Sequence, residues 1–328
     1  MTPITAFMNE KLFRPYFGDP ESWRSWFVLI RAAWGEALEG EDLALFRSLT
    51  GRERPPAKRV RELWCVAGRR SGKTRMLAFL ATYMALLVDF KPYLATGERG
   101  VVCLVAPDRK QATVALRYIK GILSANPVFA QYITSERTDG LSLSNGIDVE
   151  VITCSYRTIR GRTIVAALLD EVAFWHDETT ANPDAEVLAA IRPAMVSLPE
   201  SLLLVASTPY AQRGILYKAY KDFYGKADDD VLVVTAPSVT LNPTLDRKKI
   251  DKALKEDPEA AESEYLATFR RDLESFISRD AVQSCVVPER YELPVAENCY
   301  YAAFVDPAGG SGKDSMTLAI EGIVTVTT

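Results

Sequence analysis

The residues with the clearest chemical potential form one short loop, Ala67-Gly-Arg-Arg-Ser-Gly-Lys-Thr74. This run matches the phosphate-loop pattern GxxxxGK[ST], except that Ala67 replaces the first glycine. In such a loop the backbone N–H groups cradle phosphates, Lys73 reaches the β- and γ-phosphates, and the Thr74 hydroxyl binds Mg²⁺. The sequence therefore predicts nucleotide contacts from Gly68, Arg69, Arg70, Ser71, Gly72, Lys73 and Thr74.

Two carboxylates follow a hydrophobic run further along the chain, Ile164-Val-Ala-Ala-Leu-Leu-Asp-Glu171. Asp170 can hold Mg²⁺ through water, and Glu171 is then placed to polarise an attacking water as general base. An Asp-Glu pair can also cap a helix, but its position downstream of a phosphate loop favours the catalytic interpretation. No Asn-Lys-x-Asp motif is present, which argues against a switch GTPase. A small-molecule kinase does not need a glutamate directly after the aspartate, so the pair favours an ATP-hydrolysing motor.

A second pair of polar residues ends the apolar run Leu202–Ala206. Ser207 and Thr208 stand directly before Pro209. Their hydroxyls could sense the γ-phosphate if this strand lies beside the phosphate loop. The alternative is a plain turn before the proline.

Arginines supply the remaining chemistry. Arg157, Arg160 and Arg162 lie just before the Asp-Glu strand. Three cations so close together are typical of a solvated face. In a ring-shaped motor, however, one of them could reach a neighbouring subunit's γ-phosphate as a finger in trans. Arg69, within the phosphate loop, is the competing finger in cis.

These residues must be positioned by regular elements. Short apolar runs read as strands and alternate with helical segments such as Lys73–Val88 and Gly214–Tyr224. This alternation predicts an α/β fold, a P-loop NTPase with a mostly parallel sheet flanked by helices on both faces. The expected strands are Leu63–Ala67, Val101–Ala106, Val149–Thr153, Ile164–Leu169, Leu202–Ala206 and Val231–Thr235.

Residues 1–60 are expected to be helical and amphipathic. Trp23 and Trp26, with the neighbouring apolar residues, recur at helical spacing and predict a packing face. Aromatic residues here are also candidates for the adenine contact. Tyr16, Phe17 and Trp23 are equally placed for that role on sequence alone.

The C-terminal part follows a different pattern. Tyr300–Val305 reads as a strand, Asp306–Asp314 as a turn, and Met316–Ile320 and Ile323–Thr327 as two further strands. We therefore divide the chain into an N-terminal helical segment of the ATPase domain, a P-loop ATPase domain, a linker and the start of another domain. Their bounds are 1–60, 61–272, 273–298 and 299–328.

Composition excludes several classes of protein. At 328 residues the chain suits roughly two domains, and its net charge of −4 argues against a uniformly basic DNA-coating protein. The five cysteines form no CxxC and there is one histidine, which argues against a zinc site and suits reduced cytosolic thiols. The N-terminus has no secretory signal pattern, and the longest apolar stretch, Met76–Val88, is shorter than the ~20 residues that span a membrane.

Five blocks in order resemble the large subunit of a tailed-phage terminase, the DNA-packaging motor. They cover about Trp64 to Asp314 and read GRRSGKT, LLDEVAFW, LLLVASTPYAQRGILYKAY, ESEYLATFRRDLESFIS and FVDPAGGSGKD. The resemblance implies an N-terminal ATPase followed by a C-terminal ribonuclease H-like nuclease. By motif, it makes Lys73 and Thr74 ligands of ATP and Mg²⁺, Asp170 the Mg²⁺ carboxylate and Glu171 the catalytic carboxylate. Arg69 matches the family's loop arginine.

The resemblance also gives roles to later residues. Ser207 and Thr208 match the motif that couples hydrolysis to DNA movement, and Asp306 matches the first metal-binding acid of the nuclease. Such a nuclease needs several carboxylates from distant strands. Apart from Asp314, few acids follow Asp306, so we expect an incomplete ribonuclease H-like domain without DNA cleavage.

The implied partners are those of a packaging motor. They are double-stranded DNA, bound through its phosphates without sequence preference, a homo-oligomeric ring of this chain, a portal and a small terminase subunit. The implied location is the cytoplasm of the bacterial host. Two alternatives remain at this stage: another P-loop DNA motor such as a helicase, and a nucleotide-gated structural remnant that does not hydrolyse ATP.

Overall fold

The computed structural model describes residues 1–152, 158–175, 183–270, 299–306 and 317–324, with residues 284, 287 and 295. The chain forms two compact units, Met1–Glu274 and Ser275–Thr328. Within the described ranges, no helix is both long enough and apolar enough to cross a bilayer.

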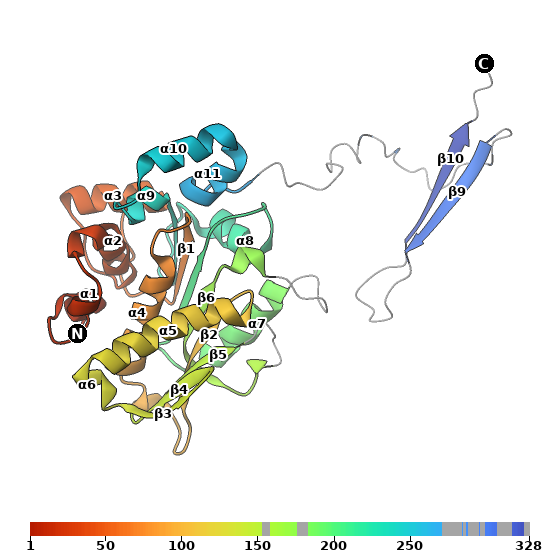
Figure 1. The fold of residues 1–328 in the computed structure, drawn as a ribbon. Helices are drawn as coiled ribbons and strands as arrows, with labels where there is room; N and C mark the ends of the chain where they lie inside the picture. Colours follow the sequence, from red (N-terminus) through yellow and green to blue (C-terminus); the bar gives the residue numbers. More distant parts are fainter. Residues whose placement is uncertain are drawn as a thin grey trace. The chain divides into compact units, whose positions relative to one another are not determined.

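The larger unit is built on an eight-stranded sheet in the order β3-β4-β5-β2-β6-β7-β1-β8 (Figure 1). In this order the six strands β5, β2, β6, β7, β1 and β8 run parallel, and β4 and β3 add an antiparallel edge. The sequence prediction of a mostly parallel sheet is therefore confirmed. The bounds are β1 Glu62–Ala67, β2 Gly100–Val105, β3 Ile133–Arg137, β4 Gly140–Leu143, β5 Ile147–Ile152, β6 Thr163–Asp170, β7 Leu202–Ser207 and β8 Val231–Ala236.

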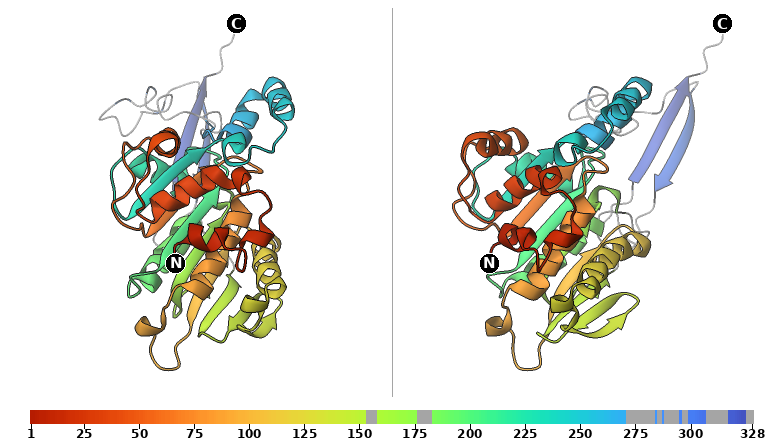
Figure 2. Two further views of the ribbon diagram at one scale, coloured as in Figure 1. Left: turned by 90° about the vertical axis from the view of Figure 1, so that its left-hand side faces the viewer. Right: turned by 60° about the vertical axis from the view of Figure 1, so that its left-hand side comes forward.

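Helices cover both faces of this sheet (Figure 2). Alternate side chains of each strand point to opposite faces, so Leu63 and Cys65 enter one core while Trp64 and Val66 enter the other. Helices α1–α5 pack on the first face and α7 and α8 on the second. The α-helices are α1 Pro3–Met8, α2 Arg24–Ala33, α3 Gly40–Thr50, α4 Lys73–Leu87, α5 Arg109–Ala125, α6 Pro127–Ala130, α7 Pro183–Met195, α8 Gly214–Phe223, α9 Ser238–Leu241, α10 Arg247–Glu256 and α11 Pro258–Leu266.

Two features of this unit were not predicted from the sequence. The hairpin β3–β4 has a mostly exposed, polar first strand, so it lacks the apolar run that marked the other strands. Its two-residue turn, Thr138-Asp139, lies between the paired residues Arg137 and Gly140. Helix α7 was the other omission, and it covers the second face against β6 and α8.

The smaller unit contains one antiparallel pair, β9 Cys299–Asp306 and β10 Thr317–Val324. The sequence prediction of two strands at 316–320 and 323–327 is wrong within the described residues, because a single strand, β10, runs from Thr317 to Val324 across the expected break; residues 316 and 325–327 lie outside the described residues. Gly322 does not interrupt β10, since its backbone pairs with Tyr301 in the ladder. Tyr300 and Phe304 are exposed on this pair.

An aromatic cluster joins the N-terminal helices to the helix that follows the phosphate loop. The Phe7 ring of α1 lies with its centroid 4.5 Å from Phe17, 4.7 Å from Phe27 and 5.2 Å from Phe79 of α4. The Phe13 ring centroid lies 4.9 Å from that of Phe79. Residues 1–60 thus share one core with the ATPase sheet.

Replacing Phe7 by alanine should strongly destabilise the protein. The side chain is fully buried, and deleting a buried phenylalanine typically costs about 3–5 kcal/mol. The adjacent Met8 is 47% exposed, so Met8→Ala is a matched control that should change stability by about 0.5 kcal/mol or less. Denaturant unfolding measures both. Equal, small losses would mean that α1 does not belong to the core.

Candidate active site

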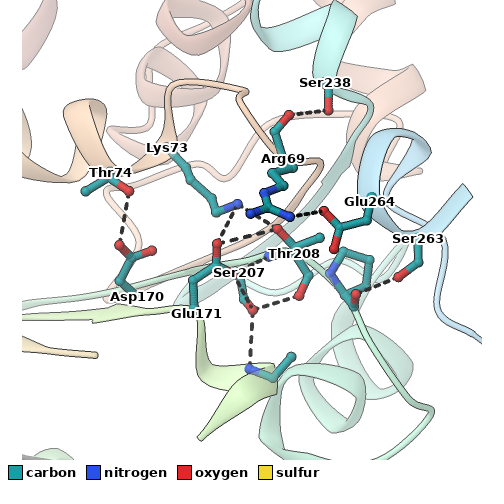
Figure 3. A network of polar contacts seen from close by, with 12 residues as sticks. Arg69, Lys73, Thr74, Asp170, Glu171, Ser207, Thr208, Ser238, Ser263 and Glu264 are labelled. Atoms are coloured by element: carbon teal, nitrogen blue, oxygen red, sulfur yellow. Dashed lines mark hydrogen bonds and ion pairs between the residues drawn. The ribbon is translucent and has the colours of Figure 1, made fainter. Parts of the chain in front are cut away.

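Three adjacent strands deliver the predicted site residues to one edge of the sheet. The strands β6, β7 and β1 are neighbours, and their carboxyl ends are level: Asp170 pairs with Ala206, and Ser207 with Val66. The phosphate loop follows β1, the two carboxylates close β6, and Ser207-Thr208 closes β7. Figure 3 shows their side chains converging.

The phosphate loop has the backbone geometry that its sequence predicted. Gly72 has a φ of 84°, and a Cβ there would lie 3.0 Å from the Trp23 ring. Gly68 has no room for a side chain either, because a Cβ would lie 2.8 Å from the Tyr265 carbonyl oxygen. Helix α4 begins at Lys73 without a side-chain cap, so its first N–H groups are open to an anion.

Lys73 is held by the other two strands. Its Nζ lies 2.9 Å from Glu171 Oε1 and donates to Thr208 Oγ1 at 2.7 Å. The side chain is 6% exposed. A nearly buried ammonium needs such partners, and a phosphate oxygen that binds Lys73 would have to compete with them.

Asp170 and Thr74 form the second contact of the site. The Thr74 hydroxyl donates to Asp170 Oδ2 at 3.0 Å, while Asp170 Oδ1 is buried with no hydrogen-bond partner among the described residues. Burial, and after it the Glu171 charge, raise the pKa of Asp170 to about 7 against the opposing effects of Lys73 and Thr74. A buried carboxylate oxygen beside a threonine hydroxyl suits Mg²⁺, which prefers oxygen ligands.

Glu171 is fixed from several sides. Its Oε2 accepts from the Thr208 backbone N–H at 2.8 Å and from the Ser207 hydroxyl at 3.3 Å. Its backbone has a φ of 52°, in the left-handed region that non-glycine residues rarely occupy. Such strain persists where surrounding contacts enforce it, and it is common at active sites.

The structure separates the candidate arginines. Arg69 points to Glu264 of α11, with its Nη1 3.2 Å from Glu264 Oε2 (Figure 3). Arg162 pairs with Glu150 and donates to the Thr158 carbonyl. It precedes β6, at the opposite end of the strand from Asp170, so roughly 25 Å separates the two. Arg162 therefore cannot act on its own subunit's site.

Arg157 and Arg160 are the other two arginines of the group that precedes β6. Arg160 is exposed at the same end of β6 as Arg162. Arg157 lies outside the described residues.

The adenine candidates are now distinguishable. Phe17 and Trp23 are buried in the aromatic cluster, and the Trp23 indole donates to the Phe17 carbonyl. Tyr16 is only partly buried. Of the three, it alone has substantial accessible surface for a base.

Several residues of the site's surroundings had no sequence signal. Trp26, Ser238 and Asn242 each donate to the phosphate loop, and Ser263 donates to the Pro209 carbonyl at 2.7 Å. Trp26, Ser238 and Asn242 lie in none of the quoted motif blocks, and Ser263 lies in one but had no role assigned to it, so spacing did not reveal these contacts. For the nuclease, the backbone of Asp306 ends β9, while its side chain and Asp314 lie outside the described residues.

Comparisons with known proteins find one family match for part of the chain. Residues 64–209 match the family described as the N-terminal part of the T4likevirus-type terminase large subunit. A search of curated proteins gives no significant match.

Solved structures of phage terminases share the fold. The large terminase ATPase domain of Thermus phage P74-26 is 17% identical with a TM-score of 0.51, over 73% of this chain and 97% of that one. The large terminase of bacteriophage HK97 is 19% identical with a TM-score of 0.51, over 80% of this chain and 57% of that one. The ADP complex of a large terminase from a thermophilic bacteriophage is 13% identical with a TM-score of 0.50, over 92% of this chain and 65% of that one.

The chain thus spans almost all of an isolated terminase ATPase domain and about three fifths of two longer terminase chains. The matched residues 64–209 contain the phosphate loop, the Asp170-Glu171 pair and the Ser207-Thr208 pair, which are the parts that converge in the structure. Over residues 64–209 the chain is therefore similar to the N-terminal part of phage terminase large subunits, and it shares the fold of their ATPase domains.

Proposed function

We propose that this chain hydrolyses ATP, with Mg²⁺, to drive double-stranded DNA into a viral procapsid. The observation that carries the proposal is the convergence of Lys73, Glu171 and Thr208 from three adjacent strands. The working form would be a homo-oligomeric ring in the cytoplasm of the bacterial host. A portal and a small terminase subunit would be its partners, and DNA would be held through its phosphates.

Nucleotide binding begins in the phosphate loop. The open N–H groups of the loop and of the α4 N-terminus receive the phosphates, and Lys73 pairs with the terminal ones. Asp170 and Thr74 hold Mg²⁺, as the buried partnerless oxygen of Asp170 supports. Mg²⁺ at that position would neutralise charge on the phosphate oxygens.

The same step releases the general base. Without nucleotide, Glu171 is paired with Lys73. When Lys73 turns to a phosphate, Glu171 loses that partner and keeps the Ser207 and Thr208 donors, which hold its orientation. Glu171 then accepts the proton of the attacking water. The base therefore becomes active only when phosphate is present.

Coupling to movement would start at Thr208. Its hydroxyl contacts Lys73 and its backbone N–H contacts Glu171, so it meets both groups that respond to the phosphate. The next residue, Pro209, accepts from Ser263 of α11, and the Tyr210 carbonyl accepts from the Arg270 backbone N–H. A shift at Thr208 would be transmitted to α11 and the chain that follows it.

Lys73→Ala should weaken nucleotide binding and abolish DNA-stimulated phosphate release, because it removes the cation that meets the ground-state phosphates. Isothermal titration with ATP and ADP, and phosphate release with and without double-stranded DNA, measure the two effects. Lys110→Ala on the exposed start of α5 is the control for losing one charge. Unchanged affinity together with full activity in Lys73→Ala would contradict the proposed function.

Glu171→Gln should bind ATP nearly as well as the wild type but lose turnover by about 10²–10⁴-fold, the typical contribution of a general base. The amide keeps the shape and loses the basicity. Glu62→Gln is a matched control, because Glu62 is also paired with a cation, Arg192, but at the far end of β1. Hydrolysis by Glu171→Gln within about threefold of wild type would remove Glu171 from this role.

Mixing experiments should separate the arginines. A finger that acts in trans leaves its own subunit's phosphate loop intact, so an alanine variant mixed with Lys73→Ala should regain part of the ATPase activity. We expect this rescue for one of Arg157, Arg160 and Arg162. Arg69→Ala should gain nothing from mixing. Rescue of Arg69→Ala, and of none of the others, would reverse the assignment.

A further inference from the structure

We propose that Trp26, Ser238 and Asn242 are positioning residues that hold the phosphate loop in its binding conformation before nucleotide arrives. Each donates to one of three consecutive carbonyl oxygens of the loop. Ser238 Oγ donates to Arg69 O at 2.6 Å, Asn242 Nδ2 to Arg70 O at 2.9 Å, and Trp26 Nε1 to Ser71 O at 2.9 Å. The inference rests on the proposed nucleotide site and adds residues that its motif does not contain.

These contacts fix where the loop's N–H groups point. In a planar trans peptide the carbonyl oxygen and the following N–H point in opposite directions. Binding the carbonyls of residues 69, 70 and 71 therefore turns the N–H groups of residues 70, 71 and 72 to the other side. Within the described part of the chain, those three N–H groups donate to no protein acceptor. They are left for an anion.

The contact between Asn242 and Arg70 also opposes backbone strain at Arg70. Arg70 has a φ of 63°, a left-handed conformation that disfavours any residue with a side chain. A phosphate-free loop would gain by relaxing at this residue, and such relaxation would rotate the adjacent peptides. Asn242 resists this. Its own amide is oriented by Thr244, whose backbone N–H and hydroxyl both donate to Asn242 Oδ1, so that Nδ2 faces Arg70.

The three donors come from two structural elements that touch each other. Trp26 lies on α2, which contacts α9; Ser238 begins α9, and Asn242 directly follows its last residue. Trp26 and Ser238 are buried, whereas Asn242 is only partly buried. Asn242 is therefore the position where the contact can be removed with the least effect on the core.

Asn242→Ala should raise the Kd for ATP and ADP and the KM for ATP by about three- to tenfold, the equivalent of one hydrogen bond. The value of kcat should stay within about twofold, because the loop contacts ground state and transition state alike. Titration calorimetry and steady-state phosphate release on the full chain measure these values.

Asn145→Ala is the matched control. Asn145 donates to the Ala85 carbonyl at 2.7 Å and accepts from the Ile147 N–H at 3.3 Å, at the other end of α4. The Asn145→Ala variant also loses a side-chain amide hydrogen bond to a backbone carbonyl in the same domain. It should lower thermal stability at least as much as Asn242→Ala, and it should leave nucleotide affinity unchanged.

A double-mutant cycle with Arg70→Gly separates positioning from a general structural role. Glycine adopts a positive φ freely, so it needs less restraint at this residue. The affinity loss caused by Asn242→Ala should therefore shrink to less than about twofold when measured in the Arg70→Gly background. Comparison within that background cancels the loss of the Arg70 charge.

The proposal is overturned if Asn242→Ala leaves Kd and KM unchanged, or if its affinity loss is the same in both backgrounds. The Lys73→Ala titration distinguishes this failure from failure of the site itself. A normal loss in Lys73→Ala with no effect of Asn242→Ala refutes only the positioning role. No loss in either variant refutes the nucleotide site.

Discussion

The nearly buried charge of Lys73 is the constraint on which the site depends. An ammonium that leaves water must be paired and hydrogen-bonded, or the cost of desolvation is several kcal/mol. Glu171 and Thr208 provide that pairing without nucleotide. They can do so only because β7 lies directly beside β1 and β6 lies beside β7, with the carboxyl ends of the three strands level. The strand order therefore explains how the ammonium of Lys73 can be nearly buried and still be paired.

The site is also strained, and the strain is held by its surroundings. Arg70 and Glu171 both have a positive φ, one in the phosphate loop and one directly after β6. Each is restrained by hydrogen bonds from other segments, Asn242 for Arg70 and the Thr208 N–H for Glu171. Pre-organisation of this kind lowers the cost of ordering the loop when a phosphate binds.

Sequence reasoning succeeded where chemistry is local. A loop of fixed spacing, a strand ending in Asp-Glu and a strand ending in Ser-Thr are each defined by adjacent residues, and the structure brings all three to one point. Apolar runs identified the buried strands, since each must suit a covered sheet. The hairpin β3–β4 was not predicted, because its exposed residues form no apolar run. A strand break was predicted around Gly322, but the backbone of Gly322 pairs with that of Tyr301 and the strand continues.

The sequence by itself determined the phosphate loop, its carboxylate partners, the parallel α/β class and the family resemblance, because each depends on residues close together in the chain. Only the tertiary structure decided the pairing of Lys73 with Glu171 and the contact of Arg69 with Glu264. It also placed Trp26, Ser238 and Asn242 on the loop. These contacts join segments up to 195 residues apart. No local pattern encodes them, since they follow from the order in which strands assemble and helices cover them.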